Sequence, residues 1–479
     1  MEKWATVEEK KIVQQRSSFE KMFAQEPKED QSELQLEDGS RVAVVGGGPA
    51  GSYFTYFLLD MASMLEMDLQ VDVYEPRDYG CVGPRSCNMC GGIISESLVQ
   101  ILATEGINLP PTVVQRGIDS YVLHMDVGSV RIDTPLHEMR IGAVHRGAGP
   151  RGAEGMKWES FDGHLQSLAL NKGANLIQKR VSEISWNEGR PQVNTRGGKP
   201  ETYDLLVVAV GVNSAALNFF ERLHLPYEPP GATKTVIREY RLGAETIAKF
   251  LGSSMHVFLL NIPRLEFAAI IPKGDYVTVC LLGKNIDREL FETFLSSPEV
   301  KKCMPPGWHM DEFACQCSPR MNVRAAAHPF GDRIIFIGDC GVTRLYKDGI
   351  GGAYRTAKAA ASTAIFHGIA AEDFRQQFWS ACKTIDVDNS FGKVIYLITR
   401  QIQRRRFARR AILNLTASEQ EKAGHLRLMS MVLWDMFTGS APYKEIFMRT
   451  LHPAFWTKML WSLGASALRV GANGKEGDK

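Results

Sequence analysis

The stretch that decides the fold is Val42-Ala43-Val44-Val45-Gly46-Gly47-Gly48-Pro49-Ala50-Gly51. Its first four residues are a short, largely β-branched run, which is typical of a strand buried on both faces of a parallel sheet. The rest fits GxGxxG, where Gly46 allows a tight turn, Gly48 lets a pyrophosphate approach and Gly51 lets a helix pack on the strand. Free N–H groups at the start of that helix, around Ala50, favour an anion. The stretch therefore predicts a dinucleotide site.

The residues after the glycines continue the pattern into a βαβ unit. Residues 53–67 are predicted to form a helix, and residues 71–75 a second strand that ends at Glu75. A carboxylate at this position accepts hydrogen bonds from the ribose hydroxyls of an adenosine. Glu75, followed by Pro76 and Arg77, favours FAD or NAD over NADP, because an acidic residue suits a ribose hydroxyl better than a 2′-phosphate.

Two later segments, residues 204–210 and 333–337, predict further core strands of the same sheet. The second is followed by Gly338-Asp339-Cys340-Gly341 and then by Gly349-Ile350-Gly351-Gly352, which opens a predicted helix over residues 353–367. A helix N-terminus carries a fixed positive partial charge, and reduced flavin carries negative charge near N1 and O2. Such a contact stabilises the reduced flavin, and these segments favour FAD over NAD.

On these segments the chain resembles the flavoprotein superfamily that includes aromatic hydroxylases and geranylgeranyl reductases. The resemblance implies that Asp339 contacts the ribityl chain or the pyrophosphate of FAD. It also implies that Gly349, Gly351 and Gly352 lie under the pyrimidine edge of the flavin.

The closer resemblance is to the geranylgeranyl reductase family, and it spans roughly residues 41–400. It rests on Cys87-Asn88-Met89-Cys90-Gly91-Gly92, which is similar to the family's CGG segment beside the flavin and the reacting alkene. This implies catalytic positions for Cys90, Gly91 and Gly92. A thiol is mostly protonated at neutral pH, so Cys90 can donate a proton or, as a small residue, shape the flavin face. Further stretches agree with the family at residues 146–151, with Arg151 as a cofactor contact, 161–174 and 271–275.

Two departures from the superfamily bear on the reaction. Hydroxylases usually carry Asp-Gly after the strand at 204–210, where this chain has Val210-Gly211, and this weighs against an NAD(P)H-dependent monooxygenase. Tyr346-Lys347-Asp348 stands in place of a family proline. A second GxGxxG for a nicotinamide is not visible, so NAD(P)H, a ferredoxin or another electron-donor protein stay open as the electron source.

The patterns predict an α/β fold: a Rossmann-type FAD-binding domain with a parallel sheet, an inserted, mostly antiparallel β-sheet substrate domain, and a helical C-terminal region. The expected boundaries are 1–39 for a charged N-terminal extension, 40–119, 143–225 and 318–375 for the discontinuous FAD-binding domain, 120–142 and 226–317 for the substrate domain, and 376–479 for the helical domain.

Composition excludes several classes of protein. Lys and Arg number 56 against 54 Asp and Glu, a formal charge of +2, which argues against a nucleic-acid partner. The sequence shows neither a secretory signal nor an apolar run long enough to span a membrane, so a cytoplasmic protein is expected.

The nine cysteines include no four-ligand set of CxxC pairs, so no metal site is expected. His145, His164 and His328 stand alone in their segments, and a structural role is expected for them.

A basic amphipathic helix is predicted near residue 400. Phe391, Val394, Ile395, Ile398 and Ile402 recur at helical spacing, and six arginines follow between residues 400 and 410. Such a helix can lie on an anionic membrane surface, which would make the protein peripheral on the inner membrane face. It can equally pack on the domain with a solvated basic face.

The sequence therefore predicts an FAD-dependent oxidoreductase that reduces C=C bonds of a hydrophobic polyprenyl or isoprenoid lipid, or of a quinone side chain, by hydride transfer from reduced flavin. The first alternative is an FAD-dependent monooxygenase or dehydrogenase that acts on a hydrophobic substrate. The second is a non-catalytic flavin-binding subunit of a membrane-associated assembly.

Overall fold

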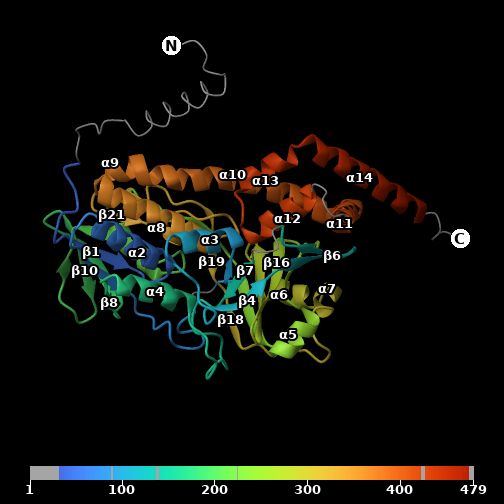
Figure 1. Ribbon diagram of the computed structural model, residues 1–479, viewed down its shortest axis with the longest axis horizontal. Helices are drawn as coiled ribbons and strands as arrows, with labels where there is room; N and C mark the ends of the chain where they lie inside the picture. The colour runs from blue at the N-terminus through green and yellow to red at the C-terminus, as the bar shows by residue number, and fades with distance from the viewer. Residues whose placement is uncertain (1–31, 88–89, 136–139, 224, 422–426, 474–479) are drawn as a thin grey trace, which may run out of the picture.

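The computed structural model describes residues 32–87, 90–135, 140–223, 225–421 and 427–473 (Figure 1). Residues 1–31 of the expected N-terminal extension lie outside the described residues, and so do Asn88 and Met89 of the CGG segment. The described chain forms two large sheets next to each other, with long C-terminal helices across them (Figure 1).

A six-stranded sheet carries the glycine loop. Its strands, in spatial order, are β20 (Phe330–Gly331), β21 (Ile334–Phe336), β12 (Leu205–Val208), β1 (Arg41–Val45), β2 (Gln70–Tyr74) and β8 (Asn175–Ile177). β1 pairs in parallel with β12 and β2, with Val44 opposite Val207 and Val73, and β20 adds an antiparallel edge. Residues 42–45 are buried because both faces of this sheet are covered. The predicted parallel sheet is confirmed.

Helices cover one face of the parallel sheet, and a small sheet covers the other. The helices are α2 (Pro49–Met64), α3 (Glu96–Thr104), α4 (Phe161–Asn171) and α8 (Gly349–Phe366). α2 begins four residues earlier than predicted, because Pro49 suits the first helical turn, where no N–H is needed. The opposite face is covered by β9 (Val181–Asn187), β10 (Arg190–Thr195), β11 (Glu201–Thr202) and the 3₁₀ helix η1 (Ala215–Leu223).

A seven-stranded sheet forms the second half of the molecule. Its strands, in spatial order, are β18 (Cys315–Cys317), β14 (Val236–Arg241), β17 (Tyr276–Gly283), β16 (Leu265–Lys273), β15 (Ser254–Phe258), β5 (Ser120–Met125) and β6 (Gly128–Asp133). Neighbouring strands are antiparallel except β15 and β5, which run parallel. The predicted inserted, mostly antiparallel sheet is confirmed. The exact domain boundaries stay a prediction.

Shorter elements join the two sheets. Strands β3 (Ile93–Ile94), β4 (Val114–Ile118) and β7 (Ile141–Val144) form one small sheet. Strands β13 (Gly231–Lys234) and β19 (Arg320–Arg324) form a two-stranded ribbon. The last of these elements is the 3₁₀ turn η2 (Gly338–Cys340).

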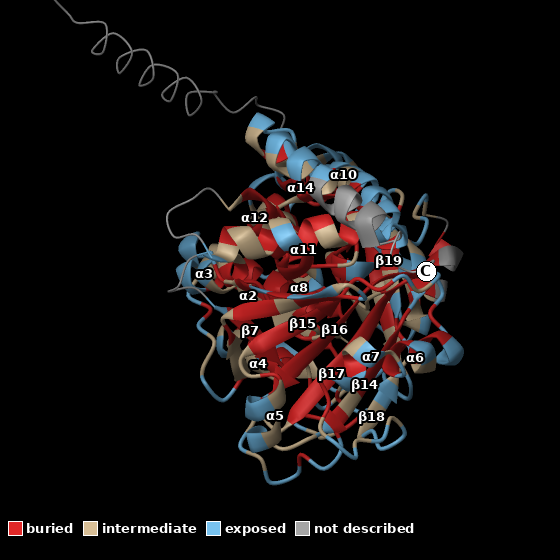
Figure 2. Cartoon of the chain, turned by 90° about the vertical axis from the view of Figure 1, so that its right-hand side faces the viewer, coloured by how far each residue is buried: buried red, intermediate tan, exposed pale blue. Residues whose placement is uncertain are grey.

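Successive side chains of the seven-stranded sheet point to opposite layers. Strands β14 to β17 of this sheet are largely buried (Figure 2). One layer is closed by α5 (Ala244–Phe250), α6 (Arg288–Leu295) and α7 (Pro298–Lys301). The other layer is closed by the C-terminal helices α10 (Trp379–Arg404), α11 (Arg406–Glu421), α12 (Leu428–Thr438), α13 (Tyr443–Thr450) and α14 (Pro453–Asn473). The short helix α9 (Ala371–Asp373) and the π-helix η3 (Phe374–Phe378) precede them in the chain. The predicted helical C-terminal region is confirmed.

Within the described residues, no helix combines the length and the apolar character that crossing a bilayer requires. The longest helix, α10, instead lies along the outside of the molecule with one side on the core (Figure 1).

Trp434 on α12 shows how closely the C-terminal helices join the sheet. Its indole is fully buried, stacks on Tyr121 of β5 with ring centroids 5.5 Å apart, and donates a hydrogen bond to Glu96 Oε1 at 2.7 Å. One side chain therefore links α12, the sheet and α3.

We expect Trp434→Ala to lower the free energy of unfolding by about 3–5 kcal/mol, because it leaves a large cavity and an unpaired carboxylate. Denaturant titration followed by circular dichroism measures the change. The matched control is Trp461→Ala on α14, where the side chain is 80% exposed and the change should stay within about 0.5 kcal/mol. Equal effects of the two substitutions would contradict this account of the core.

Candidate cofactor and substrate site

The glycine loop joins β1 to α2 through contacts that exclude side chains. Gly46 has φ +107°, and a Cβ there would lie 2.5 Å from Ala209 O on the neighbouring strand segment. A Cβ on Gly51 would lie 1.9 Å from Gly46 O. Both glycines are therefore required by the backbone itself, and the N-terminus of α2 is held directly behind the loop.

Glu75 lies beside this loop at the end of β2. Its Oε2 accepts hydrogen bonds from the Gly47 N–H and the Tyr79 hydroxyl, each at 3.0 Å, and its Oε1 accepts one from the Arg77 N–H at 2.9 Å. Pro76 is exposed next to it. The structure thus brings Glu75, Pro76 and Arg77 together with the glycine loop, and the carboxylate is held where a ribose next to the phosphates would be.

The GD segment, Gly338-Asp339, lies against α2, the helix that follows the glycine loop. A Cβ on Gly338 would be 2.7 Å from the Cβ of Ala50, and the Gly338 N–H donates to Thr356 Oγ1 of α8 at 3.0 Å. Asp339 itself is exposed, so a ligand can reach its carboxylate. Asp339 therefore lies beside α2 and α8, as a contact to the middle of a dinucleotide requires.

The start of α8 presents Gly349, Gly351 and Gly352 behind an unusual N-cap. Asp348 has a left-handed backbone, with φ +53°, and its buried carboxylate forms ion pairs with Arg344 at 2.8 Å and Arg355 at 2.7 Å. The close approach of Asp348 to Gly351 leaves no room for a Cβ there, which would lie 2.0 Å from Asp348 Oδ1.

Side chains of the C-terminal helices hold this helix start from behind. Lys347 is buried and donates to the carbonyls of Asp435 and Ala441, at 2.8 and 3.0 Å. Burial lowers the pKa of Lys347 to about 7. Asn389 of α10 bonds the backbone on both sides of Arg344, accepting from the Leu345 N–H and donating to Thr343 O. The residues that replace the family proline thus anchor the helix start to α10 and α12.

These four segments fit a dinucleotide. The glycine loop and the start of α8 supply helix N-termini, Glu75 a ribose acceptor and Asp339 a second acceptor. Their contacts with one another are direct, through Gly47 and Glu75, Ala50 and Gly338, and Gly338 and Thr356.

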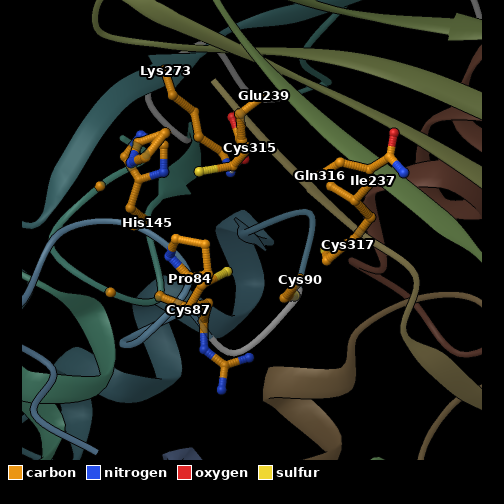
Figure 3. Close-up of a pocket in the computed structure, with 15 residues that line it drawn as sticks. Pro84, Cys87, Cys90, His145, Ile237, Glu239, Lys273, Cys315, Gln316 and Cys317 are labelled. Carbon is orange, nitrogen blue, oxygen red and sulfur yellow. Dashed lines mark ion pairs between the residues drawn. The ribbon is translucent and has the colours of Figure 1, made fainter. Parts of the chain in front are cut away.

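A pocket, open at its mouth, lies between this region and the seven-stranded sheet (Figure 3). Figure 3 shows Pro84, Cys87 and Cys90 on one side and the strand residues Ile237, Glu239 and Gln316 on the other. The complete lining is Gly83, Pro84, Cys87, Cys90, His145, Arg146, Gly147, Gly149, Pro150, Ile237, Glu239, Lys273, Cys315, Gln316 and Cys317.

The CGG segment reaches this pocket. Gly92 has φ +69°, and a Cβ there would lie 2.0 Å from Val144 O and 2.8 Å from Lys273 Nζ. Its N–H donates to Cys90 Sγ at 3.4 Å. A Cβ on Gly91 would touch Cys280 Sγ at 3.8 Å. The structure therefore brings Cys90, Gly91 and Gly92 together beside a buried lysine; their catalytic role stays a prediction.

Lys273 and Glu239 form a buried ion pair that the sequence interpretation did not include. Lys273 is 1% exposed, and its Nζ lies 3.9 Å from Glu239 Oε1. Thr278 donates to that carboxylate, at 2.8 Å to Oε1 and 2.9 Å to Oε2. Burial raises the pKa of the Glu239 carboxyl, whereas Lys273 and Thr278 lower it. The pocket thus contains a positively charged proton donor with a nearby carboxylate.

His145, expected to be structural, also lines the pocket. Its ring stacks on Trp158, with centroids 5.4 Å apart, and its buried Nε2 has no hydrogen-bond partner among the described residues. Burial and the charge of Lys273 lower the pKa of His145 well below its ordinary value, so the imidazole is neutral. An unsatisfied buried nitrogen at a pocket wall marks a place where a ligand can bond.

Two arginines of the segment 146–151 have different surroundings. Arg146 lines the pocket and forms a two-pronged ion pair with buried Asp162 of α4, one prong being 2.9 Å long. Asp162 raises the pKa of Arg146 against the opposing effect of burial. Arg151 is exposed, and its N–H donates to Cys315 Sγ at 3.3 Å. Arg151 thus lies toward β18 rather than the glycine loop, and its role in cofactor binding stays a prediction.

Four of the nine cysteines line the pocket: Cys87, Cys90, Cys315 and Cys317. All nine are described, and each is a thiol rather than part of a disulfide. Burial raises the pKa of the Cys317 thiol, and the nearby Cys87 raises it further. The sequence pairs CxxC and CxC therefore converge on one pocket, the first from the loop before β3 and the second from β18.

No protein-family model and no curated protein matches this sequence. Its fold is the one shared by FAD-dependent oxidoreductases of known structure. A geranylgeranyl bacteriochlorophyll reductase-like protein of Thermoplasma acidophilum superposes with a TM-score of 0.59 at 14% identity, over 87% of this chain and 99% of that chain. The resemblance inferred from the sequence is confirmed at the level of the fold.

Two other solved structures show how wide this fold class is. The halogenase PltM, in complex with phloroglucinol and FAD, superposes with a TM-score of 0.56 at 13% identity, over 90% of this chain and 92% of that chain. The p-nitrophenol 4-monooxygenase PnpA from Pseudomonas putida gives a TM-score of 0.54 at 14% identity, over 85% of this chain and 100% of that chain.

The buried, neutral His145 predicts a pH dependence of stability. Its folded-state pKa is lower than the ordinary 6.5, so its contribution is fully present above pH 6.5 and is lost as pH falls below that value. We expect His145→Gln to remove this loss, up to about 1.4 kcal/mol per pH unit. Unfolding free energies at pH 7.5 and pH 5 measure it. Exposed His367→Gln is the control, and parallel pH profiles for His145→Gln and the unmodified chain would contradict the expectation.

Proposed function

We propose that the chain binds FAD and is an FAD-dependent oxidoreductase. The observation that carries this is the direct contact among the glycine loop, Glu75, the GD segment and the start of α8, next to a separate pocket. In this arrangement the start of α2 would hold the phosphates, Glu75 the adenosine ribose and the start of α8 the flavin. The CGG segment would then lie beside both the flavin and the substrate pocket.

We propose further that the reaction is reduction of C=C bonds in a polyprenyl or isoprenoid lipid. Reduced FAD, when bound, supplies a hydride to one carbon of the double bond. The other carbon needs a proton, and Lys273 holds one inside the pocket. Glu239 lies 3.9 Å from this lysine, and a small backbone at Gly91 and Gly92 lets the alkene approach. Cys90 is the second candidate for the proton donor.

A monooxygenase or dehydrogenase that acts on a hydrophobic substrate is the rival reaction. PltM and PnpA share the fold at similar TM-scores, so the fold does not choose between these reactions. The Lys273–Glu239 pair favours reduction, because a proton donor buried beside the CGG segment serves an alkene directly.

The electron donor is proposed to be NAD(P)H or a ferredoxin-like protein. A test of the chemistry can avoid this question by reducing the flavin with dithionite. The test then depends only on the bound cofactor and the substrate.

We expect dithionite-reduced protein, mixed without oxygen with a geranylgeranyl lipid in detergent, to add one H₂ to each reduced double bond. Mass spectrometry of the lipid measures the gain, and flavin absorbance follows reoxidation. We expect Lys273→Met to slow reoxidation by about 10²- to 10⁴-fold, because it removes the proton donor, while bound FAD stays unchanged. Lys284→Met, at an exposed lysine just after β17, is the matched control.

Three outcomes would contradict parts of this proposal. A purified chain without flavin would remove its basis. Oxygen-dependent gain of one oxygen atom would identify a monooxygenase. A flavin that no donor or substrate reduces or reoxidises would support the non-catalytic subunit.

We also propose that α10 rests on an anionic membrane surface from which the lipid enters. Four apolar side chains form an exposed stripe along this helix: Val387, Val394, Leu397 and Ile398. The basic residues Lys383, Lys393 and Arg404 flank the stripe and are exposed as well. The predicted apolar face is divided, because Phe391, Ile395 and Ile402 pack on the core. Exposed Trp456, Leu460 and Trp461 of α14 add interfacial side chains.

We expect the double substitution Val394→Asp, Ile398→Asp to reduce partitioning onto vesicles of anionic phospholipid by about tenfold or more, because it removes apolar contact and adds repulsion. Co-sedimentation measures the bound fraction, and added salt should weaken binding of the unmodified chain. Trp186→Asp, an exposed aromatic on β9, is the control. Unchanged binding after the double substitution would show that α10 does not face the membrane.

A further inference from the structure

A polar cluster lies within an apolar layer, on the face of the seven-stranded sheet that α6 and α7 cover. It consists of His124 on β5, His256 on β15 and Cys303 shortly after α7, all three buried. The layer around them is built from apolar side chains that include Phe258, Phe294, Leu295 and Val300. The proposed redox reaction uses none of the three polar residues.

The ligand atoms of the three residues converge. His124 Nε2 and His256 Nδ1 are 2.9 Å apart, and Cys303 Sγ lies 3.7 Å and 3.5 Å from them, respectively. All three atoms lie within 4.8 Å of one another. They come from segments far apart in the sequence, so the fold itself assembles the triangle.

The outer nitrogens of both imidazoles are also held. His124 Nδ1 is 2.8 Å from Ser129 Oγ, and His256 Nε2 is 3.3 Å from Leu251 O. A carbonyl only accepts, so His256 carries its proton on Nε2 and turns the lone pair of Nδ1 toward the cluster. Outer partners of this kind fix the tautomer and the orientation of metal-bound histidines.

We propose that His124, His256 and Cys303 bind a divalent cation, with Zn²⁺ as the best fit and a water in the fourth position. Two imidazoles and a thiolate suit zinc, whereas Mg²⁺ and Ca²⁺ require oxygen ligands. Tetrahedral zinc bonds of about 2.0–2.1 Å to nitrogen and about 2.3 Å to sulfur set N and S about 3.6 Å apart. Cys303 Sγ already lies at this spacing from both histidines.

The two nitrogens must separate slightly to admit zinc. The same geometry sets them about 3.3 Å apart, and the present 2.9 Å is the length of an N–H···N hydrogen bond. Zinc replaces the proton between the rings, which moves to His124 Nδ1 beside Ser129, and the thiol proton of Cys303 is released to solvent. The bound cation ties the segment after α7 to strands β5 and β15.

The test is zinc binding by the full chain. After removal of metal with a chelator, we expect the protein to rebind about one equivalent of Zn²⁺ and to melt at a higher temperature. X-ray absorption at the zinc edge should show one sulfur and two imidazole ligands in the unmodified chain. His256→Gln and Cys303→Ser should each weaken zinc binding at least tenfold, while Cys382→Ser, at a buried thiol of another core cluster, should not.

Several results would overturn the proposal. A chain that binds no zinc at micromolar concentration would leave only a hydrogen-bonded histidine pair. An absorption spectrum with two or more sulfurs would assign the metal to the pocket cysteines instead. Undiminished zinc binding in folded Cys303→Ser, checked by circular dichroism, would exclude this site. The spectrum of the unmodified chain decides the question even where a variant fails to fold.

Discussion

The contact between Gly51 and the carbonyl oxygen of Gly46 is the constraint on which the rest of the structure depends. No side chain fits between them, so α2 leaves β1 at a fixed angle and its first turn stays behind the loop. Gly338 packs on Ala50 of that first turn, and α8 packs along α2. The positions of the GD segment and of the second helix start therefore follow from the first glycine loop.

The charges around the pocket are arranged in pairs. Arg146 is held by Asp162, and Lys273 lies beside Glu239. Each cation thus has a carboxylate close by, which limits the cost of burying charge near an apolar ligand. The first pair is tight and two-pronged, which suits a positioning role. The second is looser, at 3.9 Å, which leaves the Lys273 ammonium able to turn toward a ligand.

The sequence was informative where the physical signal is local. The glycine loop, Glu75 and the parallel strands depend on short spacings and on strand periodicity, and both are visible in a single stretch of chain. The CGG segment was found by resemblance, and the structure places it at the pocket.

The Lys273–Glu239 pair was missed because strand register, with β17 between β14 and β16, brings the two residues together. His145 was assigned a structural role because its neighbours in space are absent from its own segment. The same reason hid His124, His256 and Cys303 from a search for CxxC spacing.

The anchoring of α8 by the C-terminal helices limits how this protein can be divided or recombined. Arg344 pairs with Asp388 of α10, and Lys347 reaches the carbonyls of Asp435 and Ala441, only when α10 and α12 are in place. A fragment that ended before α10 would leave Lys347 without its carbonyl acceptors and Arg344 without Asp388, beside the helix start that faces the flavin in our proposal. The C-terminal helices are therefore a structural part of the cofactor side of the molecule, and exchange of this region between distant relatives would require exchange of the segment around residue 348 as well.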